Sequence, residues 1–325
     1  MKTVLITGGC GFIGSNFIRG FLKSHPDWKV INFDKLTYCG NRQNAADFEK
    51  HPSYQFIQGD ICDSKLVAET MKQAEAVIHF AAETHVDRSI ESAEDFLMTN
   101  MIGTYTLLEA AKRSSVKRFI HISTDEVYGS ISVGAAKEED SLAPNSPYSA
   151  SKAGADLLAR SYWKTYGFPV IITRTTNNYG PYQFPEKVLP LFITNLLENK
   201  TVPLYGDGRN CRDWVYVEDN CAALELVFDK GVAGQIYNIA GEQEKNNLEL
   251  TRTILKEMGQ GEDKIRYVED RLGHDFRYSV DSQKISALGF KPKYSFIEGL
   301  RKTIQWYKDH PEWWQPLKQD KFTIK

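Results

Sequence analysis

The chain has 325 residues, and its 40 basic and 42 acidic residues leave a net charge of −2, so one large domain or two modest domains are expected. This balanced charge excludes the strong field that nucleic acid or an anionic membrane surface would need, and no apolar run reaches membrane-spanning length. Five scattered cysteines without metal-ligand spacing predict no disulfide framework, no metal site and a reduced, cytoplasmic location.

The chain starts with a predicted buried strand at 2–7 that leads directly into a glycine-rich turn and then a helix at 15–24. Glycines at every third position allow a tight turn and let a pyrophosphate approach the backbone N–H groups. The helix N-terminus adds partial positive charge for the phosphates. This segment therefore predicts a dinucleotide site, with contacts from Gly8, Gly11, Phe12, Ile13 and Gly14.

A second predicted strand, 29–33, ends at Asp34, which follows Gly14 by 20 residues. An acid at this position accepts hydrogen bonds from the adenosine ribose and repels a 2′-phosphate, so it favours NAD over NADP. Lys35 weakens this preference slightly and is also predicted to contact the cofactor.

Strand-like runs alternate with helical patterns at 2–7, 29–33, 54–58, 76–80, 117–122 and 169–174. The alternation predicts an α/β, Rossmann-like fold with a doubly wound parallel sheet, which binds its ligand at the strand ends. Just past the third strand, Asp60 either contacts the adenine edge, together with Ile61, or caps the helix that follows. The small residues Ala81 and Ala82 after the fourth strand would let the dinucleotide lie across the strand tips.

Two long amphipathic helices are predicted at 96–113 and 148–166. Their extra apolar residues either pack on the sheet or form the interface of a homodimer, and the residues alone leave both interpretations open.

After residue 175 the chain becomes richer in turn formers and polar aromatic residues. Further helices are expected at about 188–199, 217–230, 248–259 and 295–309, and a strand at 235–239 should return to the main sheet. This pattern predicts a smaller, interleaved α+β substrate-binding lobe. The NAD-binding domain would comprise 1–175 and about 210–240, and the nucleotide-sugar-binding domain about 176–209 and 241–325.

Tyr148 and Lys152 are four residues apart and would share one face of a helix. A phenol with a pKa of about 10 is a poor base at neutral pH. A nearby ammonium lowers that pKa, so Tyr148 could take a proton from a hydroxyl group that is being oxidised. Beside a dinucleotide site, the pair predicts a dehydrogenase-like step.

Asp125 and Glu126 follow the strand at 117–122, where a parallel sheet presents residues to its crevice. In a sugar oxidised at C4, one carboxylate could remove the acidified C5 proton while the other acid protonates the departing C6 hydroxyl. Close approach in a dry site would split the two pKa values as these roles require. The alternative is two solvated acids in a loop.

These motifs resemble the extended short-chain dehydrogenase/reductases, and among them the nucleotide-sugar 4,6-dehydratases. The similarity runs nearly end to end, through the segments 7–14, 81–89, 123–129, 148–152, 177–187, 206–219 and 271–278. The Thr-Asp-Glu triplet at 124–126 is specific to the dehydratases. The 4-epimerases of the superfamily share the glycines and the Tyr/Lys pair but have no need of the acids.

The resemblance implies that Thr124 hydrogen-bonds the C4 oxygen and that Tyr148 is the base for oxidation at C4. It implies that Asp125 is the acid at C6, Glu126 the base at C5, and Lys152 the group that holds the nicotinamide ribose. NAD would stay bound through the cycle, and the substrate would be dTDP-glucose. The alternatives are a UDP-glucose 4,6-dehydratase and an NAD-dependent nucleotide-sugar 4-epimerase.

Substrate contacts are also implied by the resemblance. They are Thr84, His85, Asn177, Lys187, Arg212, Asn247, Arg271 and His274. His85 either touches the sugar or braces its loop. The remaining histidines show no chemical partners in the sequence and are expected to be structural or surface residues: His25, His51, His79, His121 and His310.

Overall fold

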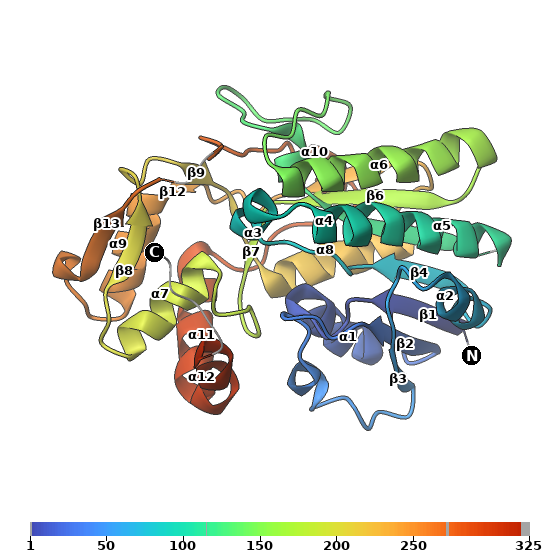
Figure 1. Cartoon of the computed structure of the whole chain (residues 1–325), viewed down its shortest axis with the longest axis horizontal. Coiled ribbons are helices and arrows are strands. Elements are labelled where there is room, and N and C mark those ends of the chain that lie inside the picture. Colours follow the sequence, from blue (N-terminus) through green and yellow to red (C-terminus); the bar gives the residue numbers. More distant parts are fainter. Residues whose placement is uncertain (1, 115, 271–272, 320–325) are drawn as a thin grey trace.

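The computed structural model describes residues 2–114, 116–270 and 273–319. Within these ranges the centre is a seven-stranded sheet in the order β11-β6-β5-β4-β1-β2-β3, and every neighbouring pair is parallel (Figure 1). Its strands are β1 (Lys2–Thr7), β2 (Trp28–Asp34), β3 (Tyr54–Gln58), β4 (Ala76–His79), β5 (Arg118–Thr124), β6 (Val170–Thr175) and β11 (Ile236–Ile239). The strand order reverses between β1 and β4, where such sheets bind their ligands. The predicted fold class is confirmed.

Helices cover both faces of the sheet, because successive side chains of a strand point to opposite faces. On β1, Val4 and Ile6 pack against one helical layer and Leu5 against the other. The first layer contains α1 (Phe12–Ser24), α8 (Val217–Lys230) and α10 (Gln283–Ala287). The second contains α2 (Ser64–Met71), α5 (Thr104–Arg113) and α6 (Pro147–Tyr166).

The helix predicted over 96–113 is not one regular α-helix. After α3 (Val86–Glu91), the short α4 (Glu94–Phe96) leads into a π-helix, η2 (Leu97–Gly103), which continues as α5. The buried Asn100 of η2 accepts a hydrogen bond from Glu83 N (2.9 Å) and donates one to Glu83 O (3.0 Å). The wide turn thus fixes the segment that follows β4. Single π-turns of this kind concentrate at functional sites.

The smaller lobe begins after β6 and has its own apolar core, which includes Tyr179, Trp214 and Tyr307 (Figure 1). Its helices are α7 (Val188–Leu197), α9 (Asn247–Glu257), α11 (Phe296–Asp309) and α12 (Pro311–Gln319). Its strands pair as β7 (Asn177–Tyr179) with β10 (Trp214–Tyr216), β8 (Val202–Tyr205) with β13 (Ile265–Val268), and β9 (Cys211–Arg212) with β12 (Lys245–Asn246). The exact domain boundaries remain a prediction.

The aromatic C-terminal helix connects this lobe to the sheet domain. Trp313 and Trp314 are buried in the smaller lobe's core, and Trp313 Nε1 donates to Asn44 Oδ1 at 2.8 Å. Asn44 lies in η1 (Arg42–Ala45), a 3-10 turn after β2; a further such turn, η4 (Glu262–Lys264), precedes β13. Across the described ranges, none of the helices combines the length and the apolar character that crossing a bilayer requires.

Candidate active site

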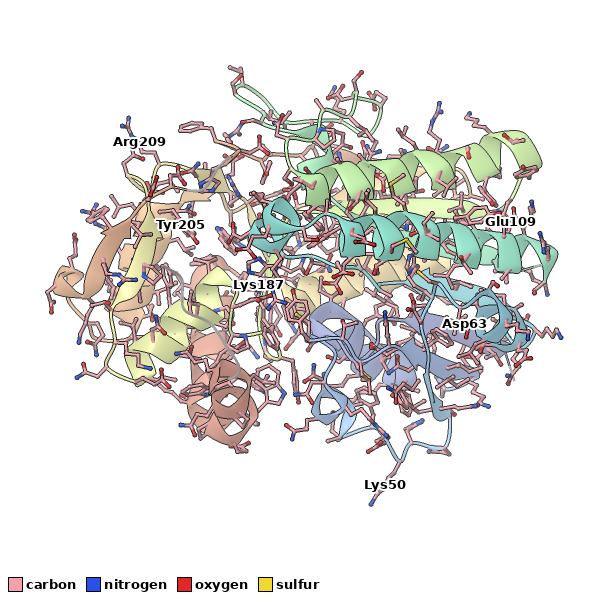
Figure 2. The ribbon with its side chains drawn as sticks, in the orientation of Figure 1. Lys50, Asp63, Glu109, Lys187, Tyr205 and Arg209 are labelled. Atoms are coloured by element: carbon pink, nitrogen blue, oxygen red, sulfur yellow. The ribbon has the colours of Figure 1, made fainter. Side chains whose placement is uncertain are left out.

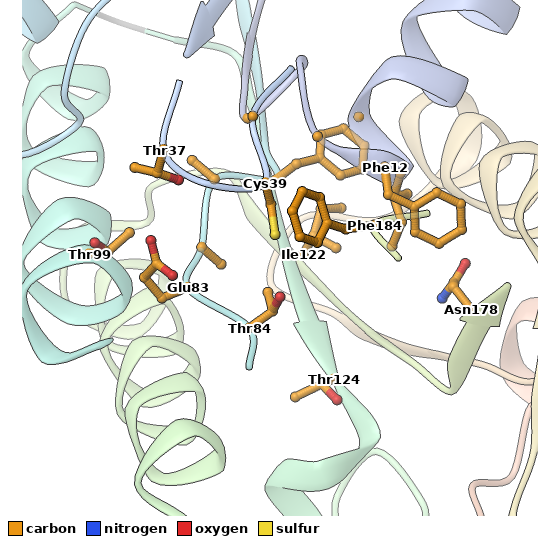
Figure 3. Close-up of a pocket in the computed structure, with 18 of the residues that line it drawn as sticks. Phe12, Thr37, Cys39, Glu83, Thr84, Thr99, Ile122, Thr124, Asn178 and Phe184 are labelled. Atoms are coloured by element: carbon orange, nitrogen blue, oxygen red, sulfur yellow. The ribbon is translucent and has the colours of Figure 1, made fainter. Parts of the chain in front are cut away.

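A cavity opens beside the ends of β1, β4 and β5, with Thr124 at the end of its strand in Figure 3. Every residue predicted to bind the cofactor lines this cavity, from Gly8 in the first turn to Lys152 on α6. All five predicted catalytic residues line it too. Their roles toward a ligand remain predictions, but the sequence-distant motifs do meet in one place.

The glycine turn closes tightly against β4. Gly8 has φ +71°, and a Cβ added there would lie 2.6 Å from Ala81 N, which is closer than real Cβ atoms come. Gly11 caps the N-terminus of α1, and a Cβ there would meet only Gly8 O, at 3.2 Å. Without a side chain at Gly11, the backbone N–H groups at this helix N-terminus stay accessible, which fits the pyrophosphate of a dinucleotide.

Replacing Gly8 by Ala is expected to lower the free energy of unfolding by about 1–3 kcal/mol, because it combines a left-handed φ with a backbone clash. NAD binding should weaken as well. The matched control is Gly20→Ala in α1, where an added Cβ meets no atom within 4 Å. That change should stabilise the helix by about 0.5–1 kcal/mol. Denaturant titrations of both variants measure the change in the free energy of unfolding. Equal changes in the two variants would contradict a strained turn at Gly8.

Asp34 is buried at the end of β2, where it braces the turn. Its Oδ2 accepts from Cys10 N (2.9 Å) and its Oδ1 from Leu36 N (2.8 Å). Lys35 Nζ forms an ion pair with Asp60 Oδ2 at 2.8 Å.

Asp63, rather than Asp60, caps α2, since its carboxylate accepts from Lys65 N and Leu66 N. The capping interpretation of Asp60 is therefore wrong. Asp60 instead lines the cavity and accepts from Cys62 N at 2.8 Å.

The acid pair stands at the start of η3 (Asp125–Tyr128), directly after β5. Thr124 Oγ1 accepts from Glu126 N (3.3 Å) and donates to Asp125 Oδ1 (3.2 Å), so the threonine holds both acidic residues. Asp125 is only 2% exposed. Glu126 is partly buried, and Tyr278 Oη donates to its Oε2 at 3.4 Å. The alternative of two solvated acids in a loop is wrong.

Burial raises the pKa of Asp125 well above its usual value, and the negative charge of Glu126 raises it further. The positive charge of Arg212 lowers the same pKa, with a smaller effect. Among the described residues, Asp125 Oδ2 has no hydrogen-bond partner. A carboxyl group in this state stays protonated where ordinary carboxyl groups are ionised, which suits the predicted general acid.

The raised pKa of Asp125 has a consequence for stability. Folded protein keeps the proton that an unfolded chain loses near pH 4, so this group's contribution is full below about pH 4 and is lost as pH rises toward the folded pKa. Asp125→Asn removes the titration. Relative to the unchanged protein, its free energy of unfolding should rise between about pH 4 and 7. Denaturant titrations at several pH values test this expectation, with a substitution of the exposed Asp140, Asp140→Asn, as the control. A difference in the free energy of unfolding between Asp125→Asn and the unchanged protein that did not depend on pH would contradict it.

Tyr148 and Lys152 lie in the first two turns of α6, which begins with Ser146 as its N-cap. Both are buried, and Lys152 Nζ donates to Ile122 O at 2.7 Å. Burial raises the pKa of Tyr148 well above its usual value, and the charge of Glu126 adds to this. Burial also lowers the pKa of Lys152 to about 8. In the protein alone, desolvation of the phenol dominates its pKa, so activation of Tyr148 by Lys152 remains a prediction.

Among the predicted substrate contacts, Thr84, Asn177 and Lys187 line the cavity. Lys187 lies between the two lobes (Figure 2), and its Nζ donates to Thr84 O at 2.9 Å. His85 caps α3, with Nδ1 accepting from Arg88 N, and its Nε2 is 3.5 Å from Glu186 Oε2. These contacts support the interpretation that His85 braces its loop.

Among the described residues, Arg212, Asn247 and His274 are not in the lining of this cavity. Arg212 is buried, donates to the carbonyl oxygen of Asp275 at 3.0 Å, and stacks on the Tyr278 ring at 4.2 Å. Asn247 is the first residue of α9. His274 pairs with an acid in the smaller lobe, Asp270, at 2.6 Å. Arg271 lies outside the described residues.

Several lining residues were missed by the sequence analysis. They include Thr37, Cys39, Glu83, Thr99, Asn178, Gln183 and Phe184. Figure 3 shows most of these side chains around the cavity. Glu83 follows the predicted fourth strand and was within reach of the strand-end argument. Thr99 could not be found this way, because the π-helix that carries it leaves no sequence period.

All five of the remaining histidines have polar groups beside them, contrary to the expectation, and two of these histidines are buried. His79 bridges two hydroxyls through its ring nitrogens, Nδ1 to Thr7 Oγ1 at 2.7 Å and Nε2 to Thr104 Oγ1 at 2.9 Å. His121 Nε2 lies 3.3 Å from Asp156 Oδ1. Both are buried behind the cavity, so their role is structural but chemically specific.

The fold and the cavity define the class of protein: a Rossmann-fold dinucleotide enzyme with the Tyr/Lys pair of the short-chain dehydrogenase/reductases. The chain belongs to the family described as GDP-mannose 4,6 dehydratase, whose model matches residues 5–303. The predicted family resemblance is thereby confirmed.

Individual relatives are similar over nearly the whole chain. The dTDP-glucose 4,6-dehydratase of Streptomyces niveus is 53% identical, with 97% of this chain and 95% of that protein covered. The structure of DesIV from Streptomyces venezuelae, a dTDP-glucose 4,6-dehydratase with NAD and TYD bound, matches with a TM-score of 0.95 at 52% identity, covering 97% and 100%. A UDP-glucuronic acid 4-epimerase from Bacillus cereus has the same fold at 28% identity, TM-score 0.89, covering 94% and 99%.

Proposed function

We propose that this protein acts as an NAD-dependent dTDP-glucose 4,6-dehydratase, which converts dTDP-glucose to dTDP-4-keto-6-deoxyglucose and water. The observation that carries the proposal is the buried acid pair in the same cavity as the glycine turn and the Tyr/Lys pair. The high identity to dehydratases, against 28% to an epimerase, supports it.

The cavity residues divide the reaction between them. NAD, which the glycine turn, Asp34 and Lys152 would hold in this cavity, would supply the redox chemistry at C4 and C6 of the sugar. Tyr148 takes the proton of the C4 hydroxyl, and Thr124 hydrogen-bonds the same oxygen. At Tyr148, a positive nicotinamide ring would offset part of the desolvation that disfavours phenolate. Lys152 holds the nicotinamide ribose.

Elimination follows once C4 is a ketone, because the ketone acidifies the C5 proton. Glu126 removes that proton, and the neutral Asp125 donates its proton to the C6 hydroxyl, which leaves as water. The raised pKa of Asp125 supports this assignment over the reverse one. Exclusion of bulk water from the cavity during the reaction would protect the unsaturated ketone.

The test is to incubate the protein with NAD and, separately, dTDP-, UDP-, GDP- and CDP-glucose. We expect dTDP-glucose to give a product lighter by one water, detected by mass spectrometry, with the highest kcat/KM of the four. GDP-mannose belongs in the same series because of the family's description. Recovery of unchanged or only epimerised dTDP-glucose would refute the proposal. Faster turnover of UDP-glucose would identify UDP-glucose as the substrate instead.

We further propose that the protein is a homodimer. Supporting residues on η2, α5 and α6 are large, apolar and exposed: Leu97, Met98, Ile102, Tyr105, Leu157 and Tyr166. Such a shared apolar face is typical of an interface. Sedimentation should give a dimer that Met98→Glu with Leu157→Glu converts to monomers; an unchanged mass would contradict this interface. The five free thiols fit the predicted cytoplasmic location, which we retain as a proposal.

A further inference from the structure

Behind the catalytic pair, charged side chains are buried between α6 and the sheet. Asp156 follows Lys152 by one helical turn, so both side chains share the face of α6 that meets the strands. Asp156 Oδ2 accepts from Arg174 Nε on β6 at 2.8 Å, and Asp156 Oδ1 lies 3.3 Å from His121 Nε2 on β5. Asp156 is 1% exposed and Lys152 4% exposed.

A buried ammonium is unfavourable unless a negative charge lies near it. The hydrogen-bond acceptor of Lys152 Nζ, the carbonyl oxygen of Ile122, is neutral and cannot balance the charge. Desolvation lowers the pKa of Lys152 to about 8, and Asp156 is the charged group that opposes this lowering. Without it, Lys152 would be neutral over more of the physiological pH range.

The neighbouring titratable groups supply no substitute for Asp156. Burial lowers the pKa of His79 on β4 and of His121 on β5, so both rings are neutral. Burial raises the pKa of Tyr148 well above its usual value and that of Tyr128 on η3 to about 12, so neither phenol is anionic at neutral pH. The pKa of Asp156 lies below its usual value despite burial, because His121 and the Arg174 cation on β6 lie beside its carboxylate.

We propose that Asp156 is a positioning residue of the reaction, which keeps Lys152 an ammonium from its place one turn behind it, while Arg174 holds the Asp156 carboxylate in that place. The inference rests on the proposed function, in which the Lys152 ammonium binds the nicotinamide ribose and acts beside Tyr148. Asp156 touches neither substrate nor cofactor in this account.

The test is the pH dependence of Asp156→Asn. Loss of the negative charge lowers the pKa of Lys152, so the ammonium form is lost at lower pH. The alkaline limb of the kcat profile should move to lower pH by about one unit or more. At pH values above this limb, kcat should therefore fall by about a further tenfold. KM for the sugar nucleotide should change little. A purely structural role would lower activity equally at every pH.

NAD affinity gives a second readout that does not need turnover. NAD binding is measured by calorimetry from about pH 6 to 9, a range that brackets a lysine pKa near 8. As pH rises, the NAD affinity of Asp156→Asn should begin to fall at a lower pH than that of the unchanged protein. Asp156→Glu should restore both limbs, and Asp140→Asn should leave them unmoved. If the protein does not turn over dTDP-glucose, the proposed function is wrong. The pH dependence of NAD binding then still tests the role of Asp156.

Asp156→Asn leaves Arg174 buried without its partner, which can prevent folding. The pair Asp156→Asn with Arg174→Gln removes both charges and is expected to fold, as thermal unfolding would record. The same downward movement of both limbs is expected for this pair. The proposal would be overturned if either variant folded and kept the pH dependence of kcat and of NAD binding that the unchanged protein shows.

Discussion

A variant that carries both Asp125→Asn and Glu126→Gln is expected to oxidise the sugar at C4 and to stop there. Tyr148, Thr124 and Lys152 remain for the first step, but no group is left to take the C5 proton or to protonate the C6 hydroxyl. Each lost acid–base group costs about 10²–10⁴-fold in rate. Mass spectrometry of the quenched reaction should show the 4-keto sugar, lighter by two hydrogens, in place of the product lighter by one water.

The single variants separate the two acids. In deuterated water, Glu126→Gln should block exchange of the C5 hydrogen, whereas Asp125→Asn should allow exchange but block loss of the C6 hydroxyl. The matched control replaces two exposed acids of a nearby loop, Glu139→Gln with Asp140→Asn, and should keep the full rate. If the double variant at the active site eliminated water at close to the unchanged rate, both roles would be wrong.

Tyr148→Phe is expected to block the reaction one step earlier, so that even the 4-keto sugar does not form. Phe keeps the ring contact with Phe96, whose centroid is 6.3 Å away, so the fold should survive. The loss of the general base should lower the rate of C4 oxidation by about 10²–10⁴-fold.

The control for that variant is Tyr162→Phe on the same helix, where the hydroxyl donates to Glu109 Oε1 at 2.6 Å, far from the reacting groups. Its turnover should be unchanged. A tenfold change in rate corresponds to about the free energy of one pKa unit. If Tyr148→Phe formed the 4-keto sugar within about tenfold of the normal rate, Tyr148 would not be the general base.

Local rules account for the parts of the site that the sequence could predict. The glycine turn needs only its spacing and the strand before it, and Asp34 needs only the end of the next strand. The acids at 125 and 126 follow an apolar strand, and a parallel sheet gathers all such strand ends at one edge. The reversal of strand order between β1 and β4 then makes that edge a cavity.

The features that escaped prediction depend on contacts between segments that no local rule pairs. The π-turn of η2 places Thr99 in the cavity and ties Asn100 to Glu83, and a hydrophobic period does not reveal it. His121 meets Asp156 only after β5 is covered by α6. The pKa of Tyr148 depends on how dry the assembled site is, which the sequence does not state.

In the proposed reaction, the hydrogen removed from C4 of the sugar returns to C6 of the same molecule while Asp125 and Glu126 expel the hydroxyl. Supplying dTDP-glucose that carries deuterium at C4 tests this most directly. We predict deuterium at C6 of the 4-keto-6-deoxy product, one solvent hydrogen at C5, and no label lost to added NAD. A 4-keto-6-deoxy product without deuterium at C6, or deuterium that appears in free cofactor, would contradict this claim.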